Sequence, residues 1–100
     1  MHDALRDKLQ SELAQVGWRD LRQHAGRGAL FLVGAGLSLL EATLAIARDD
    51  KAAVEAWLRD GSLSRPTPQQ LADWESEPDK PFESLIVQPF VIAREVTARA

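Results

Sequence analysis

The chain has 100 residues, a formal net charge of −3 and 45% hydrophobic residues, so we expect one domain with one core over residues 1–100. An acidic balance gives no general attraction to phosphate, which non-specific nucleic-acid binding needs. The absence of cysteine excludes disulfides, thiolate zinc sites and thiol nucleophiles.

Two amphipathic helices are predicted at the start of the chain. Apolar residues recur at steps of three and four residues over Asp3–Val16, which predicts the first helix. These residues are Leu5, Leu9, Leu13 and Val16. Gly17 interrupts the pattern, and the same spacing resumes over Trp18–Gly26, which predicts the second helix. Charged residues alternate with leucine at the start, so we expect no secretory signal.

An apolar run between glycines follows these helices. Residues 29–33, Ala-Leu-Phe-Leu-Val, are typical of a strand buried on both faces. From Gly28 to Ala47 the only ionisable residue is Glu41, and a run of this length could span a bilayer. The glycines and the central charge favour a strand followed by a helix, so we expect no membrane span.

Two helix starts have the sequence of a capping box. In this motif, the side chain of the cap residue and that of the third helical residue each accept a hydrogen bond from the other residue's backbone amide. The pairs are Ser38 with Glu41 and Thr67 with Gln70. The first pair predicts a helix over residues 39–48. The second has Pro68 at the first helical position and predicts a helix that ends before Pro78.

A further helix is predicted between these two, with Asp50 as its cap and Gly61 ending it in a left-handed conformation. Its apolar residues are predicted to face inward. They are Val54, Trp57 and Leu58. We expect Trp57 to anchor this helix in the core.

The remaining segments predict strands. Residues 62–65 form a short strand, and Leu85–Ile92 is too apolar for an exposed one. Pro89 cannot donate to a ladder, so it marks an edge or a bulge in this last strand. Residues 97–100 are expected to fray.

These elements predict an α+β fold, mostly helical with a small three-stranded sheet. Without the helix capped by Thr67, their order matches the connectivity of a winged helix. In that core the turn between the two helices lies at Asp49-Asp50, and the segment Thr67–Pro81 adds an extra helix to the wing.

The candidate sites are weak. One cluster of basic residues is a possible anion site. The alternative is that these residues lie at a solvated helix end, because cations are stabilising near a helix C-terminus. Its residues are Arg19, Arg22, His24 and Arg27. Gly34 and Gly36 predict a tight turn, because the third glycine of a dinucleotide-binding fingerprint is absent. We predict no catalytic residue, no cofactor and no metal ion.

Charge also disfavours DNA binding by this winged-helix-like core. The outward positions of the helix after Asp50 carry mixed charge. The segment from Asp73 to Glu83 holds five carboxylates against Lys80 alone, where a wing would approach phosphate. Nucleic-acid binding is therefore kept as the alternative function.

Two motifs carry a resemblance to a known family. An aspartate pair precedes a V-x-x-W-L-x-x-G-x-L segment, and a V-x-P-aromatic-V strand lies near the end. The residues are Asp49, Asp50, Val54, Trp57, Leu58, Gly61, Leu63, Val87, Pro89, Phe90 and Val91. With these motifs the chain resembles a small bacterial family of uncharacterised proteins, the domain of unknown function 2288. The resemblance implies a compact cytoplasmic domain and transfers no catalytic residue.

We therefore expect a non-enzymatic domain that acts through protein–protein contact, with an unidentified protein or a second copy of the chain as partner. A chain without cysteine suits the reducing cytoplasm, where we expect it to work. A small-molecule or enzymatic role ranks third, after nucleic-acid binding.

Overall fold

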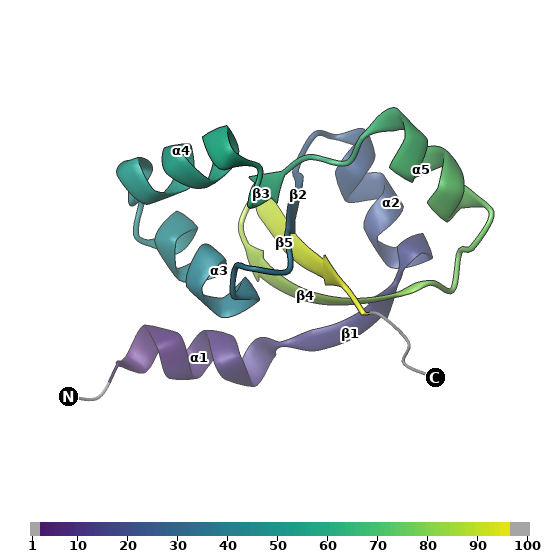
Figure 1. Ribbon diagram of the computed structural model, residues 1–100. Helices are drawn as coiled ribbons and strands as arrows, with labels where there is room; N and C mark the ends of the chain where they lie inside the picture. The colour runs from purple at the N-terminus through teal and green to yellow at the C-terminus, as the bar shows by residue number, and fades with distance from the viewer. Residues whose placement is uncertain (1–2, 97–100) are drawn as a thin grey trace.

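A five-stranded mixed sheet separates two groups of helices in the computed structural model, which describes residues 3–96 (Figure 1). The strands are β1 (Ala14–Gly17), β2 (Leu30–Val33), β3 (Leu63–Ser64), β4 (Pro81–Val87) and β5 (Phe90–Glu95). Their order across the sheet is β1-β4-β5-β2-β3. Strands β2 and β5 are parallel, and the other neighbouring strands are antiparallel. The fraying predicted for residues 97–100 lies outside the described residues.

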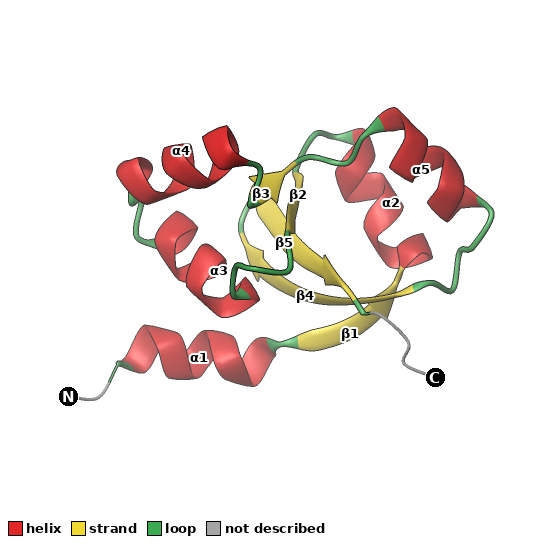
Figure 2. Ribbon diagram, in the orientation of Figure 1, coloured by secondary structure: helices red, strands yellow, loops and turns green. Residues whose placement is uncertain are grey.

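The chain is an α+β protein, because its sheet is mostly antiparallel, and helices cover both faces of the sheet (Figure 2). They are α1 (Ala4–Glu12), α2 (Trp18–Gly26), α3 (Leu39–Ala47), α4 (Lys51–Asp60) and α5 (Pro68–Glu75). Helices α1, α3 and α4 pack on one face, which we call the aliphatic face. Helices α2 and α5 pack on the other, the aromatic face.

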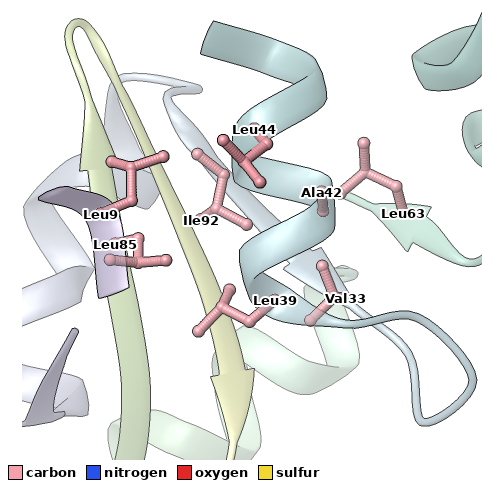
Figure 3. Packing of buried hydrophobic residues seen from close by; sticks show 8 residues of the cluster. All are labelled: Leu9, Val33, Leu39, Ala42, Leu44, Leu63, Leu85 and Ile92. Carbon is pink, nitrogen blue, oxygen red and sulfur yellow. The ribbon is translucent and has the colours of Figure 1, made fainter. Parts of the chain in front are cut away.

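The core of the aliphatic face consists of branched and small side chains (Figure 3). They are Leu9, Val33, Leu39, Ala42, Leu44, Leu63, Leu85 and Ile92. Helix α1 contributes Leu9 and is held on α3 by two ion pairs. Arg6 lies 2.6 Å from Glu41, and Asp3 lies 2.5 Å from Arg48.

The core of the aromatic face is built around three rings. The ring centroids of Trp18 and Trp74 are 5.1 Å apart, and Trp74 meets Phe82 edge-on at 5.1 Å. The indole N–H of Trp18 donates to Glu75 at 2.8 Å, which satisfies a polar group that burial would otherwise leave without a partner. This bond ties α2 to α5.

Local capping chemistry sets two helix starts where the sequence predicts them. The Thr67 hydroxyl accepts from the amide of Gln70 at 3.1 Å, and the Gln70 side chain accepts from the amide of Thr67 at 2.9 Å. The Ser38 hydroxyl accepts from the amide of Glu41 at 3.2 Å. The predicted return bond to Ser38 is wrong, because the Glu41 carboxylate pairs with Arg6 on α1 instead.

Helix α4 starts and ends as predicted. The Asp50 carboxylate accepts from the amide of Ala53 at 3.2 Å, and Gly61 has φ of 85°. Trp57 packs against the aliphatic core but is only partly buried, and Leu58 is 45% exposed. The inward position predicted for Leu58 is wrong, because adjacent residues of a helix point about 100° apart and Trp57 takes the inward direction.

The first predicted helix is too long. It ends at Glu12, and residues 14–17 form the edge strand β1, in which Ala14 lies opposite Ser84 and Gly17 opposite Pro81. The helical spacing of apolar residues continues through Val16, but pairing with β4 overrides this local pattern.

The last predicted strand is two strands. The chain reverses at Gln88-Pro89, and β4 and β5 form an antiparallel hairpin in which Val87 lies opposite Phe90. Helices cover both faces of this hairpin, so the residues on both sides of the turn are apolar, and their composition does not reveal the reversal. Pro89 lies in the turn, where its missing N–H removes no ladder bond.

The three-stranded sheet and the enlarged wing are also wrong. The sheet has five strands, because β1 joins it and the last apolar segment forms two strands. A wing would need β3 and β4 as neighbours, whereas β3 pairs with β2, and β4 pairs with β1 and β5. The segment between β3 and β4 instead carries α5 over the aromatic face.

Candidate functional site

The basic residues predicted as an anion site lie on α2 and just after it, and most are engaged within the protein. Arg19 and Arg22 approach carboxylates of residues 75–79 at 2.5 and 3.6 Å. Arg27 Nη2 lies 2.7 Å from Nδ1 of His24. An anion site at these four residues stays a prediction, and two of its arginines already have carboxylate partners.

Three of the five carboxylates in the acidic segment Asp73–Glu83 are paired with arginines from other elements. Glu75 and Asp79 are the partners of the two α2 arginines, and Glu83 pairs with Arg94 on β5. These arginines come from α2 and β5, outside the segment, so a sum of charges along the sequence does not include them. The segment therefore repels a phosphate backbone less than its own charges predict.

A cavity of about 470 Å³ lies at the carboxyl ends of β2 and β5, beside the turn of residues 34–36. Open sheets with parallel strands commonly bind ligands at this position. Three of its polar side chains already serve the fold, because Gln70 caps α5 while Arg94 and Glu95 form ion pairs within the protein. The fourth, Ser64, has no such bond among the described residues.

A second cavity, of about 290 Å³, opens on the aliphatic face where α3 ends and α4 begins. Its apolar lining consists of Phe31, Ala45, Ile46, Val54 and Phe90. Its rim consists of Asp49, Asp50, Lys51 and Glu55. We call it the Phe31–Phe90 groove. Its volume is at the lower end for small-molecule pockets, so it suits a side chain better than a cofactor.

Two phenylalanines from the parallel strands form the floor of the groove. The rings of Phe31 on β2 and Phe90 on β5 have centroids 5.5 Å apart and meet edge-on at 64°. The guanidinium of Arg65 lies 5.0 Å from the ring centroid of Phe31, a cation–π contact. Both phenylalanines are partly exposed, so aromatic surface remains for an apolar partner.

The turn at Asp49-Asp50 closes one end of the groove. The amide of Asp49 donates to Ile46 O at 3.1 Å and that of Asp50 donates to Ala45 O at 2.8 Å, the bonds of a Schellman cap. Asp49 has φ of 56°, in the left-handed region that favours glycine. Because Asp50 also caps α4, the turn is short and places both carboxylates at the rim.

The rim of the groove is acidic, with three carboxylates against the ammonium of Lys51. Asp50 is bonded to the backbone of α4. Within residues 3–96, Asp49 and Glu55 form no ion pair, unlike Glu75 and Asp79 next to α2. The groove therefore combines an apolar floor with negative charge that no cation of the described chain neutralises directly.

Residues 3–96 contain neither a metal-binding cluster nor a membrane-spanning helix. No group of three or more His, Asp and Glu side chains is arranged to hold a metal ion there. None of the described helices combines the length and the hydropathy that crossing a bilayer requires, and the run from Gly28 to Ala47 forms β2 and α3.

Sequence reasoning missed the groove. Phe31 and Phe90 meet only because β2 and β5 pair in parallel, with Phe31 opposite Ile92. The Asp49-Asp50 pair gave no signal of the groove, because helix capping accounts for both residues. Asp50 caps α4, and the left-handed Asp49 belongs to the Schellman cap of α3.

Comparisons with known proteins agree with the motif resemblance. The family described as "Protein of unknown function (DUF2288)" matches residues 4–95. The solution NMR structure of PA1075 from Pseudomonas aeruginosa is 35% identical over 100% of this chain and 92% of that chain, with a TM-score of 0.80. No curated protein matches. The chain belongs to the DUF2288 family, whose function is unknown.

Proposed function

We propose that this protein is a non-enzymatic protein-binding domain of the cytoplasm and that the Phe31–Phe90 groove takes an apolar side chain of its partner. One observation carries the proposal: an apolar cavity whose rim holds two carboxylates without an ion pair among the described residues. The cytoplasmic location rests on the absence of cysteine.

The chemistry of the groove defines the partner segment that fits it. An apolar side chain gains roughly 25 cal/mol for each Å² of apolar surface that it buries on the floor. A Lys or Arg next to that side chain would meet Asp49 and Glu55 at the rim, which favours the correct orientation and speeds the encounter. The expected ligand is therefore a helix or peptide with one large apolar residue flanked by basic residues.

The lining of the groove supports binding over catalysis. It contains no histidine, serine or threonine, so it lacks the residues most often used as general base and hydroxyl nucleophile. In the cavity of about 470 Å³, Gln70, Arg94 and Glu95 are engaged in a cap and two ion pairs, and the hydroxyl of Ser64 has no histidine beside it in the lining.

Nucleic acid is a poorer occupant of this groove, because phosphates would approach three carboxylates at its rim. We therefore do not propose DNA binding as a second function, and tight binding of duplex DNA would contradict the proposal.

A selection of displayed random peptides on the intact protein tests the proposal. We expect the recovered peptides to share a Leu, Phe or Met flanked by Lys or Arg, and labelled copies to bind with a rise in fluorescence anisotropy. Replacing their basic residues by Glu should remove binding. Glu55→Lys should weaken it by roughly five- to tenfold, because repulsion replaces attraction at the rim.

The matched control is Glu77→Lys, the same charge reversal at an exposed carboxylate beyond the end of α5. It should leave peptide affinity unchanged. The proposal fails if no peptide is enriched, if the two charge reversals weaken binding equally, or if the protein binds duplex DNA more tightly than the selected peptides.

A further inference from the structure

We propose that a second copy of this chain supplies the side chain that fills the groove, through antiparallel packing of α4 against α4 of the second copy. The inference rests on the proposed function of the groove and names its partner. In this arrangement, Leu58 of each copy lies over the Phe31–Phe90 groove of the other copy.

Leu58 is the apolar side chain that the arrangement uses. Its side chain is 45% exposed. Among residues 3–96, the only other exposed large hydrophobic residues are Leu13 and Ile86. Leu58 follows Val54 by four residues, so both lie on the same flank of α4. Because Val54 lines the groove, this flank joins the groove to an exposed leucine.

The charges of α4 are complementary to those of a second α4 that runs antiparallel to it. Glu55 lies at the rim of the groove, and Arg59 follows it by four residues. Neither side chain has an ion pair within the described residues. An antiparallel second helix places its Arg59 over the acidic end of the groove, next to Asp49 and Glu55.

Two-fold symmetry makes each contact occur twice. With the axis near Ala56, Leu58 of one copy lies opposite Val54 of the other, since these residues are equally far from the axis along the helix. The same surface then serves as ligand and as receptor in both copies, and no other segment has to change its fold.

The burial of α4 fits this arrangement. Its residues Val54 and Trp57 pack on the core of their own chain, but no residue of α4 is fully buried. Every other described helix contributes at least one buried side chain. A second copy on α4 would cover the flank that its own chain leaves open.

The other two exposed hydrophobic residues lack this combination. Leu13 follows α1 beside the acidic Glu12, and Ile86 projects from β4 on the aromatic face, away from the groove. Only Leu58 lies one helical turn from the groove with an adjacent cation.

The interface is small, and this sets the expected affinity. Helix α4 has 10 residues, about 15 Å in length, and contacts along one such helix bury less than a standard interface of ~1,200–2,000 Å². We therefore expect a monomer–dimer equilibrium with a dissociation constant on the order of 10–100 μM.

Sedimentation velocity on the full chain, from roughly 5 to 500 μM, tests the inference. The wild-type sedimentation coefficient should rise with concentration from monomer to dimer. Leu58→Glu should weaken association at least tenfold, with the fold retained because the side chain is exposed. Ile86→Glu places the same charge at a side chain that is 53% exposed, and should leave association unchanged.

A charge exchange on α4 gives a second readout. Arg59→Glu alone should weaken the dimer, and combining it with Glu55→Arg should restore it, because each copy then carries the reversed pair. A chain that stays monomeric over the whole range contradicts the inference. So does a Leu58→Glu variant that dimerises as well as the wild type.

The two proposals fail in different ways. If the chain is monomeric while the groove binds basic-flanked peptides, the second copy is the wrong partner and the protein-binding function stands. If the chain dimerises through Leu58, the selected peptides should dissociate the dimer. A dimer that Leu58→Glu abolishes but saturating peptide leaves intact would contradict a shared groove.

Discussion

The helices on the two faces of the sheet bury their side chains to different extents. On the aromatic face, Trp18, Trp74 and Phe82 are all less than 5% exposed, and an indole bond to Glu75 joins the two covering helices. On the aliphatic face, α4 has no fully buried residue and stands beside an open groove. The rings of the aromatic face are closed in by their own chain, although Ile86 is exposed at that face, whereas α4 on the aliphatic face stands beside an open groove.

Some of the charged side chains follow the same division, although Glu77 beyond α5 has no ion pair among the described residues. The arginines of α2 are paired with Glu75 and Asp79, which come from the segment that crosses the aromatic face. The carboxylates of Asp49 and Glu55 at the groove have no such partner within residues 3–96. We therefore expect the aromatic face to carry much of the stability, and the groove side is the one to which our proposal assigns partner binding.

The largest expected effect comes from opening the aromatic face. Trp74→Ala removes a ring that contacts both Trp18 and Phe82. We expect a loss of about 3–5 kcal/mol in the free energy of unfolding, because a buried aromatic leaves a cavity. Urea unfolding followed by circular dichroism measures it, and a loss of less than about 1 kcal/mol would contradict the closed core.

Trp57→Ala is the matched change on the groove side. Trp57 is only partly buried against the aliphatic core, so we expect a smaller loss of about 1–2 kcal/mol in the same urea experiment. Equal losses for the two tryptophans would mean that α4 is as firmly packed as α5, which would remove the contrast between the faces.

Substitutions of Asp49, at the turn between α3 and α4, should change the free energy of unfolding by less, with opposite signs for glycine and alanine. Its φ of 56° suits glycine, so Asp49→Gly should raise the free energy of unfolding by about 0.5–1 kcal/mol. Asp49→Ala should lower it by a similar amount, on the order of 0.5–1 kcal/mol. Thermal unfolding of both variants checks the signs, and a stabilising alanine would contradict the left-handed conformation.

The smallest expected effect is a pH dependence in how firmly α1 is held on α3. The Arg48 guanidinium, and then the amide of Arg6, lower the pKa of Asp3 below its ordinary value. A carboxyl whose pKa is lowered on folding contributes stability above its unfolded pKa, and this contribution is lost as pH falls through the lowered value. The protection factors of the α1 amides, in which the intrinsic pH dependence of exchange is divided out, should therefore fall in acid below roughly pH 4.

The Asp3→Asn variant separates this effect from general acid unfolding. It should show faster exchange in α1 at neutral pH and a smaller further change on acidification, while exchange in α2 stays as in the wild type. An acid response of α1 that is the same in both proteins would show that Asp3 is not the titrating group.

Local chemistry explains why the helix boundaries could be predicted from the sequence. Thr67 with Gln70, and Asp50 with Gly61, act within a few residues of each other, and each is found where expected. The errors occur where pairing across the sheet overrides a local pattern. Val16 continues a helical spacing but lies in β1 because β4 is there to pair with it.

The groove could not be predicted for the same reason. Its floor comes from residues near the beginning of β2 and β5, and only the parallel pairing of these strands brings them together. The charges mislead in a related way. The acidic segment Asp73–Glu83 looks repulsive in one dimension, but the fold places Arg19, Arg22 and Arg94 against it.

The most direct test of the central claim is a nitrogen–proton NMR titration of the intact protein with a selected basic-flanked peptide, at a protein concentration below that of self-association. We expect the shift changes to cluster at Phe31, Ile46, Val54 and Phe90 and to leave the indole signals of Trp18 and Trp74 unmoved. Changes centred on α2 and α5, with the groove unaffected, would contradict the account.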